Sequence, residues 1–516
     1  MWPAPSLAST LHATVASPRL IRPQGFMLRA EASSSHDRRR NVVVIGAGWA
    51  GLASAHHLCK QGFDVTILGA GSCPTEEIAL RGFWCPYHNI FSIIDELGIK
   101  PFTMRTKFAL YTSEGVQFPH LSLLDRLTSI PLISAVIDFD NTDTAWRKYD
   151  AMTAKELLKQ YGCSERLYRE IYQPFIEVGL LAPAEQCSAA TTLSMLYYYV
   201  LSHQQNFDVV WCRGTVQEKI FLPWLETMKS KGCTFHGNKK VTDFVVNEST
   251  GHISGVLCGQ DFYEADAFVQ ATCISTLKSI VANSSTLQSR QEFLNILNLA
   301  AVDVVHVKIW LDRKVKIPRA INVCSGHENS IGWVFFDLNS LFDEYEGEPA
   351  TVLEAEFYHA NQLLVLKDEQ IVLKLMSSLS RFIKELEQVS VVQQKVSRFP
   401  NSATHFFPEL ILFRLSLTQT GSSSFYLPLE LITGSYNYMM KGSTSLPNLF
   451  MAGDWIITRH GSWSQEKAFV TGLQAANQVV DYFGEGEFAR IIPVEDDEPH
   501  IETLRELNRR FNEVRE

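Results

Sequence analysis

The sequence predicts an α/β protein in which two domains are interleaved along the chain. Three patterns predict this class. A glycine-rich turn joins a short apolar strand to a helix, a glycine and an aspartate follow another apolar strand roughly four hundred residues later, and the segments between mix helical and strand-like periodicity. A chain of 516 residues, 46% of them apolar and 20% charged, can bury a large core. Disordered and fibrous classes are therefore excluded.

Charge and cysteine content exclude further classes. The formal net charge is −10, which argues against a nucleic-acid partner because phosphate binding requires a basic face. The ten cysteines are scattered and form no CxxC pair, so neither a zinc site nor a disulfide framework is predicted, and no metal is expected. No apolar run reaches the roughly 18 residues of a membrane span.

Residues 1–40 differ in composition from the rest of the chain. They contain six arginines and two acidic residues, with frequent serine and threonine and no continuous apolar segment. This composition is typical of a transit peptide that directs a protein to an organelle, and a disordered tail is the alternative. Without this segment, residues 41–516 carry a net charge of about −14. We expect an acidic mature protein in the chloroplast or another plastid, with the mitochondrion as second choice.

Residues 41–68 have the pattern of a dinucleotide-binding unit. An apolar strand at 41–45 leads into a Gly-x-Gly-x-x-Gly turn, an amphipathic helix and a second apolar strand at 65–68. In such a turn the first glycine permits the bend, the second lets the backbone approach a pyrophosphate and the third packs helix on strand. The helix N-terminus attracts the phosphates. This Rossmann-type turn supplies the predicted cofactor-binding residues Gly46, Gly48, Trp49, Ala50 and Gly51.

One expected element of this unit is missing. The second strand of such a unit normally ends in an acidic residue that binds the adenosine ribose, and Gly69 stands at that position. Either another residue, such as Ser72, binds the ribose, or the affinity for the dinucleotide is weakened. A third reading keeps the fold and loses the cofactor.

A second motif near the C-terminus distinguishes between two cofactor classes. An apolar strand at 449–452 ends at Gly453 and Asp454, and a long amphipathic helix begins near Gln465. An acidic residue at a strand end and a helix N-terminus again converge on a polar ligand. A nicotinamide dinucleotide needs no second site so far along the chain, whereas FAD does, because its ribityl and ring end extends to another part of the fold. The sequence therefore predicts FAD.

The two motifs, VVVIGAGWAGLASAHHL and LPNLFMAGDWIITRHGSWSQEKAFVTGLQAANQ, resemble those of the flavin-containing amine oxidase and carotene desaturase superfamily. More narrowly, they are similar to the plant phytoene and zeta-carotene desaturase branch. The resemblance implies a Rossmann-type FAD-binding domain (GR2-type flavoprotein fold) interleaved with an α+β substrate domain. It also implies an FAD-dependent oxidoreductase that abstracts hydride from a carotenoid or another isoprenoid lipid. A flavin-dependent carotenoid isomerase and a non-catalytic scaffold with weakened FAD binding are the alternatives.

The resemblance also implies roles for individual residues. Asp454 matches the residue that bonds the ribityl chain or the pyrophosphate, and the segment 464–468 matches the one beneath the flavin ring. Lys467 stands where the family usually has glycine, so it either stabilises an anionic reduced ring or points to solvent. Arg81 is the nearest substitute for a basic residue that the family has after the second strand. The predicted cofactor-binding residues of the second motif are Gly453, Asp454, Ser464, Gln465 and Ala468.

The substrate is predicted to be apolar. Amine-oxidising relatives place a tyrosine where this chain has Ser464, and Trp463 lies one position away. Residues 121–137 carry an apolar stripe, which predicts either peripheral association with one membrane leaflet or a helix pair packed in the protein's own core. No general acid–base pair is evident, so no catalytic residue is assigned. His460 is the one histidine near the predicted flavin loop, and hydride transfer to a flavin requires orientation more than an acid.

The distance between the motifs predicts discontinuous domains. The FAD-binding domain is expected to comprise residues 41–110, 205–290 and 440–484. The substrate domain is expected to comprise residues 111–204 and 291–439, followed by a charged C-terminal tail at 485–516.

Overall fold

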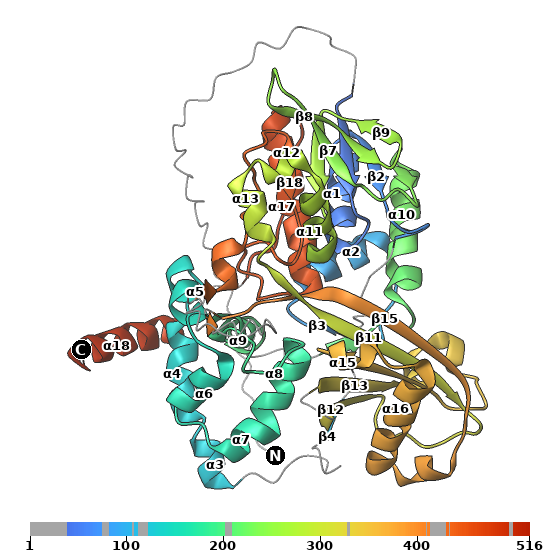
Figure 1. The fold of residues 1–516 in the computed structure, drawn as a ribbon, viewed down its shortest axis with the longest axis vertical. Coiled ribbons are helices and arrows are strands. Elements are labelled where there is room, and N and C mark those ends of the chain that lie inside the picture. The colour runs from blue at the N-terminus through green and yellow to red at the C-terminus, as the bar shows by residue number, and fades with distance from the viewer. Residues whose placement is uncertain are drawn as a thin grey trace, which may run out of the picture. The chain divides into compact units, whose positions relative to one another are not determined.

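The fold is taken from a computed structural model, shown in Figure 1. It describes residues 39–74, 82–105, 108–111, 122–201, 209–327, 331–408, 410–412, 430–432, 434–494 and 499–515. Nearly all of the predicted transit peptide, residues 1–38, lies outside the described residues, as does Arg81.

A five-stranded parallel sheet forms around the glycine-rich turn. Its strand order is β18-β10-β1-β2-β6, so strands from both ends of the chain are neighbours. The strands are β1 (Asn41–Ile45), β2 (Asp64–Leu68), β6 (Thr234–His236), β10 (Ala267–Gln270) and β18 (Leu449–Met451). The β-branched and aromatic side chains of β1, β10 and β18 are buried on both faces, as expected for a parallel sheet covered by helices. The predicted strands at 41–45 and 65–68 are confirmed.

Two helices pack closely against each other beside this sheet. Helix α1 (Trp49–Lys60) follows β1, and α17 (Gln465–Phe483) follows the second motif. A Cβ atom at Gly472 would lie 2.2 Å from the carbonyl oxygen of Ala50, so glycine is required where the helices cross. The shared core also includes α2 (His88–Leu97) and α10 (Leu222–Lys229).

The second large sheet has six strands. Its order is β15-β11-β14-β13-β12-β4. The strands are β4 (Phe108–Tyr111), β11 (Ala300–Leu311), β12 (Ile321–His327), β13 (Ile331–Asp337), β14 (Val352–Tyr358) and β15 (Val391–His405). Helix α16 (Asp368–Phe382) covers one face through Ile371, Leu375 and Leu379. On β13, Gly332 leaves room for helix α8 (Gln173–Gly179), since a Cβ there would lie 2.7 Å from the Glu177 carbonyl oxygen.

The two sheets use the segments that were predicted for different domains, with one difference. Strand β4 lies at the end of the first segment expected for the FAD-binding domain, yet it pairs with β12 in the six-stranded sheet. A four-residue strand shows no preference for either sheet in its own sequence, so only the register with β12 reveals its place. The division of residues 41–484 into an FAD-binding domain and a substrate domain remains a prediction.

A series of helices lies between β4 and the next strand along the chain. They are α3 (Leu123–Leu127), α4 (Ile130–Asp138), α5 (Asp143–Asp150), α6 (Ala154–Gln160), α7 (Glu165–Leu167), α8 and α9 (Ala189–Leu196), with π-helical turns at Tyr168–Tyr172 and Tyr197–Leu201. The apolar stripe at 121–137 forms α3 and α4. No residue of α3 is buried, so the expectation of a helix pair packed in the protein core is wrong for this helix. Helix α4 buries Leu132, Ala135 and Ile137.

Most of the remaining described elements are short. The strands are β3 (Gly82–Trp84) with β5 (Val209–Trp211), β7 (Asp243–Asn247), β8 (His252–Cys258) and β9 (Asp261–Glu264), and β16 (Leu410–Leu412) with β17 (Glu430–Ile432). The helices are α11 (Ile274–Asn283), α12 (Ser285–Gln288), α13 (Gln291–Ile296), α14 (Leu338–Leu341), α15 (Asn361–Leu364) and α18 (Pro499–Arg515). In the described part of the chain, every helix is too short or too polar to span a bilayer.

Candidate cofactor site

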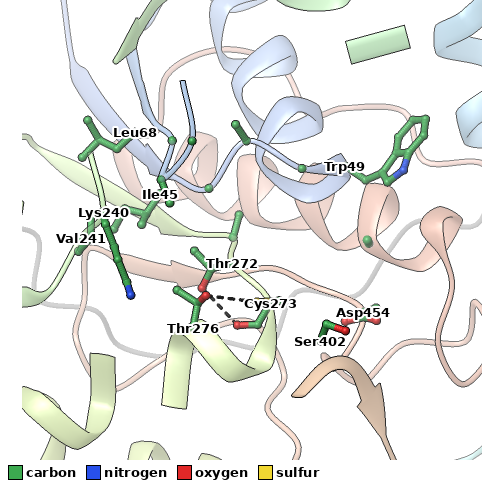
Figure 2. A pocket seen from close by; sticks show the side chains of 18 of the residues that line it. Ile45, Trp49, Leu68, Lys240, Val241, Thr272, Cys273, Thr276, Ser402 and Asp454 are labelled. Carbon is green, nitrogen blue, oxygen red and sulfur yellow. Dashed lines mark hydrogen bonds between the residues drawn. The ribbon is translucent and has the colours of Figure 1, made fainter. Parts of the chain in front are cut away.

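The carboxyl ends of three neighbouring strands open onto one cavity of about 230 Å³ (Figure 2). Strand β1 leads into the glycine-rich turn, β10 leads into Thr272 and Cys273, and β18 leads to Asp454. Ligands of open α/β sheets bind at this edge, where neighbouring loops diverge. Residues from both motifs therefore line the same space.

The glycines of the turn have distinct surroundings. Gly46 has φ +106°, and a Cβ there would lie 2.4 Å from the carbonyl oxygen of Ala271. A Cβ at Gly51 would lie 1.9 Å from the carbonyl oxygen of Gly46. At Gly48, by contrast, a Cβ would meet nothing within 4 Å, so its backbone is open to the cavity. Such an opening lets a pyrophosphate approach the main chain, and a dinucleotide fits this turn.

Three helix N-termini surround the cavity. Helix α1 begins after Gly48, α11 begins after Cys273, and α17 begins after Ser464. Ser464 caps its helix, its hydroxyl accepting a hydrogen bond from the Lys467 amide at 2.9 Å. Free N–H groups at helix N-termini carry partial positive charge, so the cavity is suited to an anionic ligand.

Asp454 is the one acidic side chain among the described residues that line the cavity. Its Oδ1 accepts a hydrogen bond from the Thr404 hydroxyl at 3.0 Å. Burial raises the pKa of this carboxyl, and the Lys467 ammonium and the Thr404 hydroxyl act in the opposite direction. A carboxylate in this position is able to accept hydrogen bonds from ligand hydroxyl groups.

The structure explains the absence of an acid at Gly69. A Cβ there would lie 2.9 Å from the ring of Phe235, so a longer side chain would displace that ring. Ser72 does not line the cavity, so the expected substitute for the ribose-binding acid is not supported. Two lysines, Lys239 and Lys240, line the cavity together with Gly69. Lys239 pairs with Asp261 at 2.6 Å, and Figure 2 shows the side chain of Lys240 extended beside the cavity.

The predicted cofactor-binding residues fall into two groups. Those that line the cavity are Gly46, Gly48, Trp49, Asp454, Ser464, Gln465 and Ala468. Trp49 contributes through its backbone, because its ring packs against Phe221 and Trp224. Ala50, Gly51 and Gly453 do not line the cavity. Gly453 instead donates its amide to the Thr471 hydroxyl at 3.0 Å, which fixes the loop that carries Asp454.

Sequence reasoning missed several cavity residues. They are Lys239, Lys240, Thr272, Cys273, Thr276, Ser402 and Ala403. Thr272 and Cys273 directly follow an apolar strand, a signal that would have indicated them. Ser402 and Ala403 lie within β15, where nothing in the sequence distinguishes them from other strand residues.

Lys467 is enclosed, which contradicts the expectation that it points to solvent. The residue is 1% exposed, and its Nζ donates to the carbonyl oxygen of Ser462 at 2.7 Å. A four-carbon side chain at a helix N-terminus gives no sequence signal of burial, because only the packing of β15 and the loop after β18 encloses it. His460 is buried but does not line the cavity.

The fold and the site define a class. The cavity lies beside a Rossmann-type turn, it is suited to an anionic ligand, and the second motif lines its far end. These are the features of a dinucleotide-dependent protein whose ligand contacts segments from both ends of the chain. Residues 44–97 match the model of an NAD(P)-binding Rossmann-like domain. Residues 80–480 match the model of the flavin containing amine oxidoreductases. The chain belongs to the flavin containing amine oxidoreductase family.

Curated relatives agree with this assignment, and solved structures share the fold. The 15-cis-phytoene desaturase of Solanum lycopersicum is 22% identical over 404 residues, which cover 70% of this chain and 68% of the relative. The probable zeta-carotene desaturase of Synechococcus elongatus is 20% identical over 467 residues, which cover 78% and 96%. Among solved structures, cyclohexylamine oxidase from Brevibacterium oxydans has a TM-score of 0.63 at 13% identity, covering 87% of this chain and 100% of that one. Putrescine oxidase has a TM-score of 0.62 at 15% identity, covering 86% and 99%.

The expected fold class and family are thereby confirmed. The chain is an FAD-dependent oxidoreductase related to the carotene desaturases. Neither the isomerase nor the non-catalytic scaffold is favoured. The open backbone at Gly48 and the helix N-termini around the cavity suit the pyrophosphate of FAD.

Proposed function

We propose that this protein removes hydride from an apolar isoprenoid substrate, a carotenoid or a related lipid, and thereby introduces a double bond. The observation that supports this most directly is the joining of both motifs in one cavity, together with curated relatives that are named as phytoene and zeta-carotene desaturases. Bound FAD would accept the hydride. The substrate cation that remains would lose a proton from the neighbouring carbon to a base as weak as water, which completes the double bond.

The cavity residues have proposed roles along the cofactor. The turn at Gly46, Gly48 and Gly51 and the N-terminus of α1 would hold the pyrophosphate. Asp454 would accept hydrogen bonds from a hydroxyl of the ribityl chain. Bound FAD supplies the hydride acceptor, and the protein supplies binding and orientation.

The protein groups near the flavin end are suited to orientation rather than to proton transfer. Trp463 lines the cavity, and its indole Nε1 donates to the Gly179 carbonyl oxygen at 3.0 Å, which fixes the ring. No histidine occurs among the described residues of the cavity wall. An apolar substrate held against a fixed indole fits these surroundings better than an amine that must be deprotonated.

Spectroscopy and product analysis test the proposal together. Purified protein reconstituted with FAD is expected to show the visible absorption of a bound flavin. A bacterial strain that makes phytoene or zeta-carotene and expresses the protein is expected to accumulate carotenoids with longer conjugation. Unchanged conjugation together with altered cis/trans ratios would contradict desaturation and favour isomerisation.

We also propose a membrane-binding surface on helices α3, α4 and α18, termed the leucine surface. It consists of Leu123, Leu124, Leu127, Ile130, Ile133, Leu504 and Leu507, all exposed. An apolar groove of about 400 Å³ adjoins it, and Ile133 and Leu504 belong to both. An exposed apolar patch beside an apolar groove suits a lipid surface from which a water-insoluble substrate is taken.

Co-sedimentation with phosphatidylcholine vesicles tests the leucine surface. The double variant Leu123→Ser/Leu124→Ser is expected to lose most vesicle binding, because these side chains are 72% and 75% exposed and their removal leaves the core intact. Leu373→Ser, which is 70% exposed on α16, is the matched control. Equal binding by the double variant and the control would contradict the proposal.

We further propose that residues 1–40 direct the protein to plastids. The support is their arginine-rich, acid-poor composition and the chloroplastic relatives of plants. A fusion of residues 1–40 to a fluorescent protein is expected to enter chloroplasts of leaf cells. Entry into mitochondria, or retention outside both organelles, would contradict the proposal.

A further inference from the structure

Lys467 is buried beside residues that line the cofactor cavity, although it does not line the cavity itself. It is the third residue of α17 and lies between Gln465 and Ala468, which both line the cavity. Its ammonium group is 5.6 Å from the centre of the Phe406 ring, directly beyond the end of β15. The side chain is therefore held between α17, β15 and the loop after β18.

Polar groups of the protein balance the positive charge of the Lys467 ammonium only in part. Among the described residues, the Ser462 carbonyl oxygen is the hydrogen-bond acceptor that Nζ reaches, although an ammonium has three donors. The helix macrodipole is unfavourable for a cation at an N-terminus. A buried charge with incomplete partners is costly, so a further negative group beside the cavity would stabilise it.

The charged groups around Lys467 leave Asp454 as its main partner. Asp454 acts on Lys467 from the loop after β18. Glu466 is adjacent in sequence but faces away, because its carboxylate accepts hydrogen bonds from the backbone amides of Asn89 and Ile90 at 2.8 and 2.9 Å. Tyr198 and Tyr199 lie on the Glu466 side and stay neutral, since burial raises the pKa of both. Burial lowers the pKa of Lys467 to about 7, and Asp454 opposes this shift.

The residues around Lys467 indicate which half of a bound dinucleotide would lie near it. The turn at Gly48 suits the pyrophosphate, and the end of β2 at Gly69 suits the adenosine half of a dinucleotide. The other half must then extend toward Asp454 and the start of α17, where Lys467 is enclosed. A flavin ring gains electrons on reduction, and positive charge nearby favours that gain because the site excludes water.

We propose that the Lys467 ammonium stabilises negative charge on the reduced flavin and thereby raises the reduction potential of the flavin. Lys467 is in this sense a positioning residue, because it sets the charge near the flavin and takes no part in the reaction itself. The inference rests on the proposed placement of FAD in this cavity.

The reduction potential of the holoenzyme tests the inference. In Lys467→Met, which keeps the length of the side chain and removes the charge, the equilibrium with a reference dye is expected to shift at least ten-fold toward oxidised flavin, which is about 30 mV for a two-electron couple. Lys467→Arg is expected to restore most of the shift. Lys278→Met is the control, because Lys278 is half-buried and, like Lys467, donates to a carbonyl oxygen, whereas none of its neighbours in the chain from 277 to 279 lines the cavity.

Four outcomes separate the inference from its alternatives. FAD retained in Lys467→Met at an unchanged potential would overturn it and leave Lys467 as a structural partner of Asp454. Failure of the wild-type protein to bind FAD would overturn the proposed function, and the inference with it. A wild-type potential that falls more steeply with pH above about pH 7 would support it even if Lys467→Met does not fold, because reduction would then bind an extra proton. A uniform slope would overturn it.

Discussion

At the scale of single residues, Asp454 lies in the cavity wall, and burial raises the pKa of its carboxyl. We expect Asp454→Ala to weaken FAD binding by about 1.5–3 kcal/mol, the contribution of a hydrogen bond to a charged group. Equilibrium dialysis or flavin content after purification measures this loss. Asp343→Ala, which removes a carboxylate paired with Arg213 and Lys219 on the surface, is the control. Unchanged flavin content in Asp454→Ala would contradict the assignment.

Glu177 gives a prediction about stability that does not involve the cofactor. The residue is 1% exposed, and among the described residues its Oε2 has no hydrogen-bond partner. Burial raises the pKa of its carboxyl from 4.5 to about 7, with Gln173 acting in the opposite direction. The folded protein therefore holds this proton between pH 4.5 and about pH 7 while the unfolded chain releases it, so the stabilising contribution is lost as pH rises through 7.

Glu177→Gln is accordingly expected to raise Tm at about pH 8 and to change it little at about pH 5, because an amide mimics the protonated carboxyl. Thermal unfolding at the two pH values measures the difference. Glu226→Gln, which removes an exposed partner of Lys229 and does not act on the Glu177 carboxyl, provides the control. An equal effect of Glu177→Gln at both pH values would show that the carboxyl is already ionised in the folded protein.

At the scale of elements, the turn between β1 and α1 separates folding from binding. Gly51→Ala places a Cβ 1.9 Å from the Gly46 carbonyl oxygen, so we expect both a lower Tm and weaker FAD binding. Gly48→Ala meets no protein atom within 4 Å, so we expect unchanged unfolding of the FAD-free protein and a loss of about 1–3 kcal/mol in FAD binding. Gly347→Ala, which also meets no atom within 4 Å, is the control for both. Equal Tm losses in the two turn variants would contradict this separation.

The same scale shows what the sequence could predict. The β1–α1–β2 unit and the helix after Asp454 are local patterns, with apolar strands, glycines and a capped helix that each act within a few residues, and both are confirmed. The place of β4, the burial of Lys467 and the cavity positions of Ser402 and Lys240 depend on pairing between distant segments. Such features have no local signal, which is why the sequence indicated the glycine-rich turn but not the cavity residues from β15 and from the segment after β6.

At the scale of the whole molecule, FAD would bind segments from both ends of the chain, so its binding would be linked to global unfolding. At a free FAD concentration 100-fold above Kd, the protein is expected to gain about 2.7 kcal/mol of stability. Differential scanning calorimetry with and without FAD measures this gain as a rise in Tm. Gly48→Ala is the control, because it should unfold like the wild type without FAD and gain less with it. No rise in the wild-type Tm would contradict a cavity that spans the chain.

The strand order of the parallel sheet also determines when the cavity forms during folding. Strand β10 lies between β1 and β18, and β18 begins at Leu449, more than four-fifths of the way along the chain. Pairings between segments so far apart form slowly and late, because the intervening loop must close first. A ribosome or an import channel that releases the chain from its N-terminus delivers the phosphate-binding turn early and the Asp454 loop last. The emerging protein thus passes through a period in which the edge of β10 is unpaired, and a chaperone that shields this edge would act before the cofactor does.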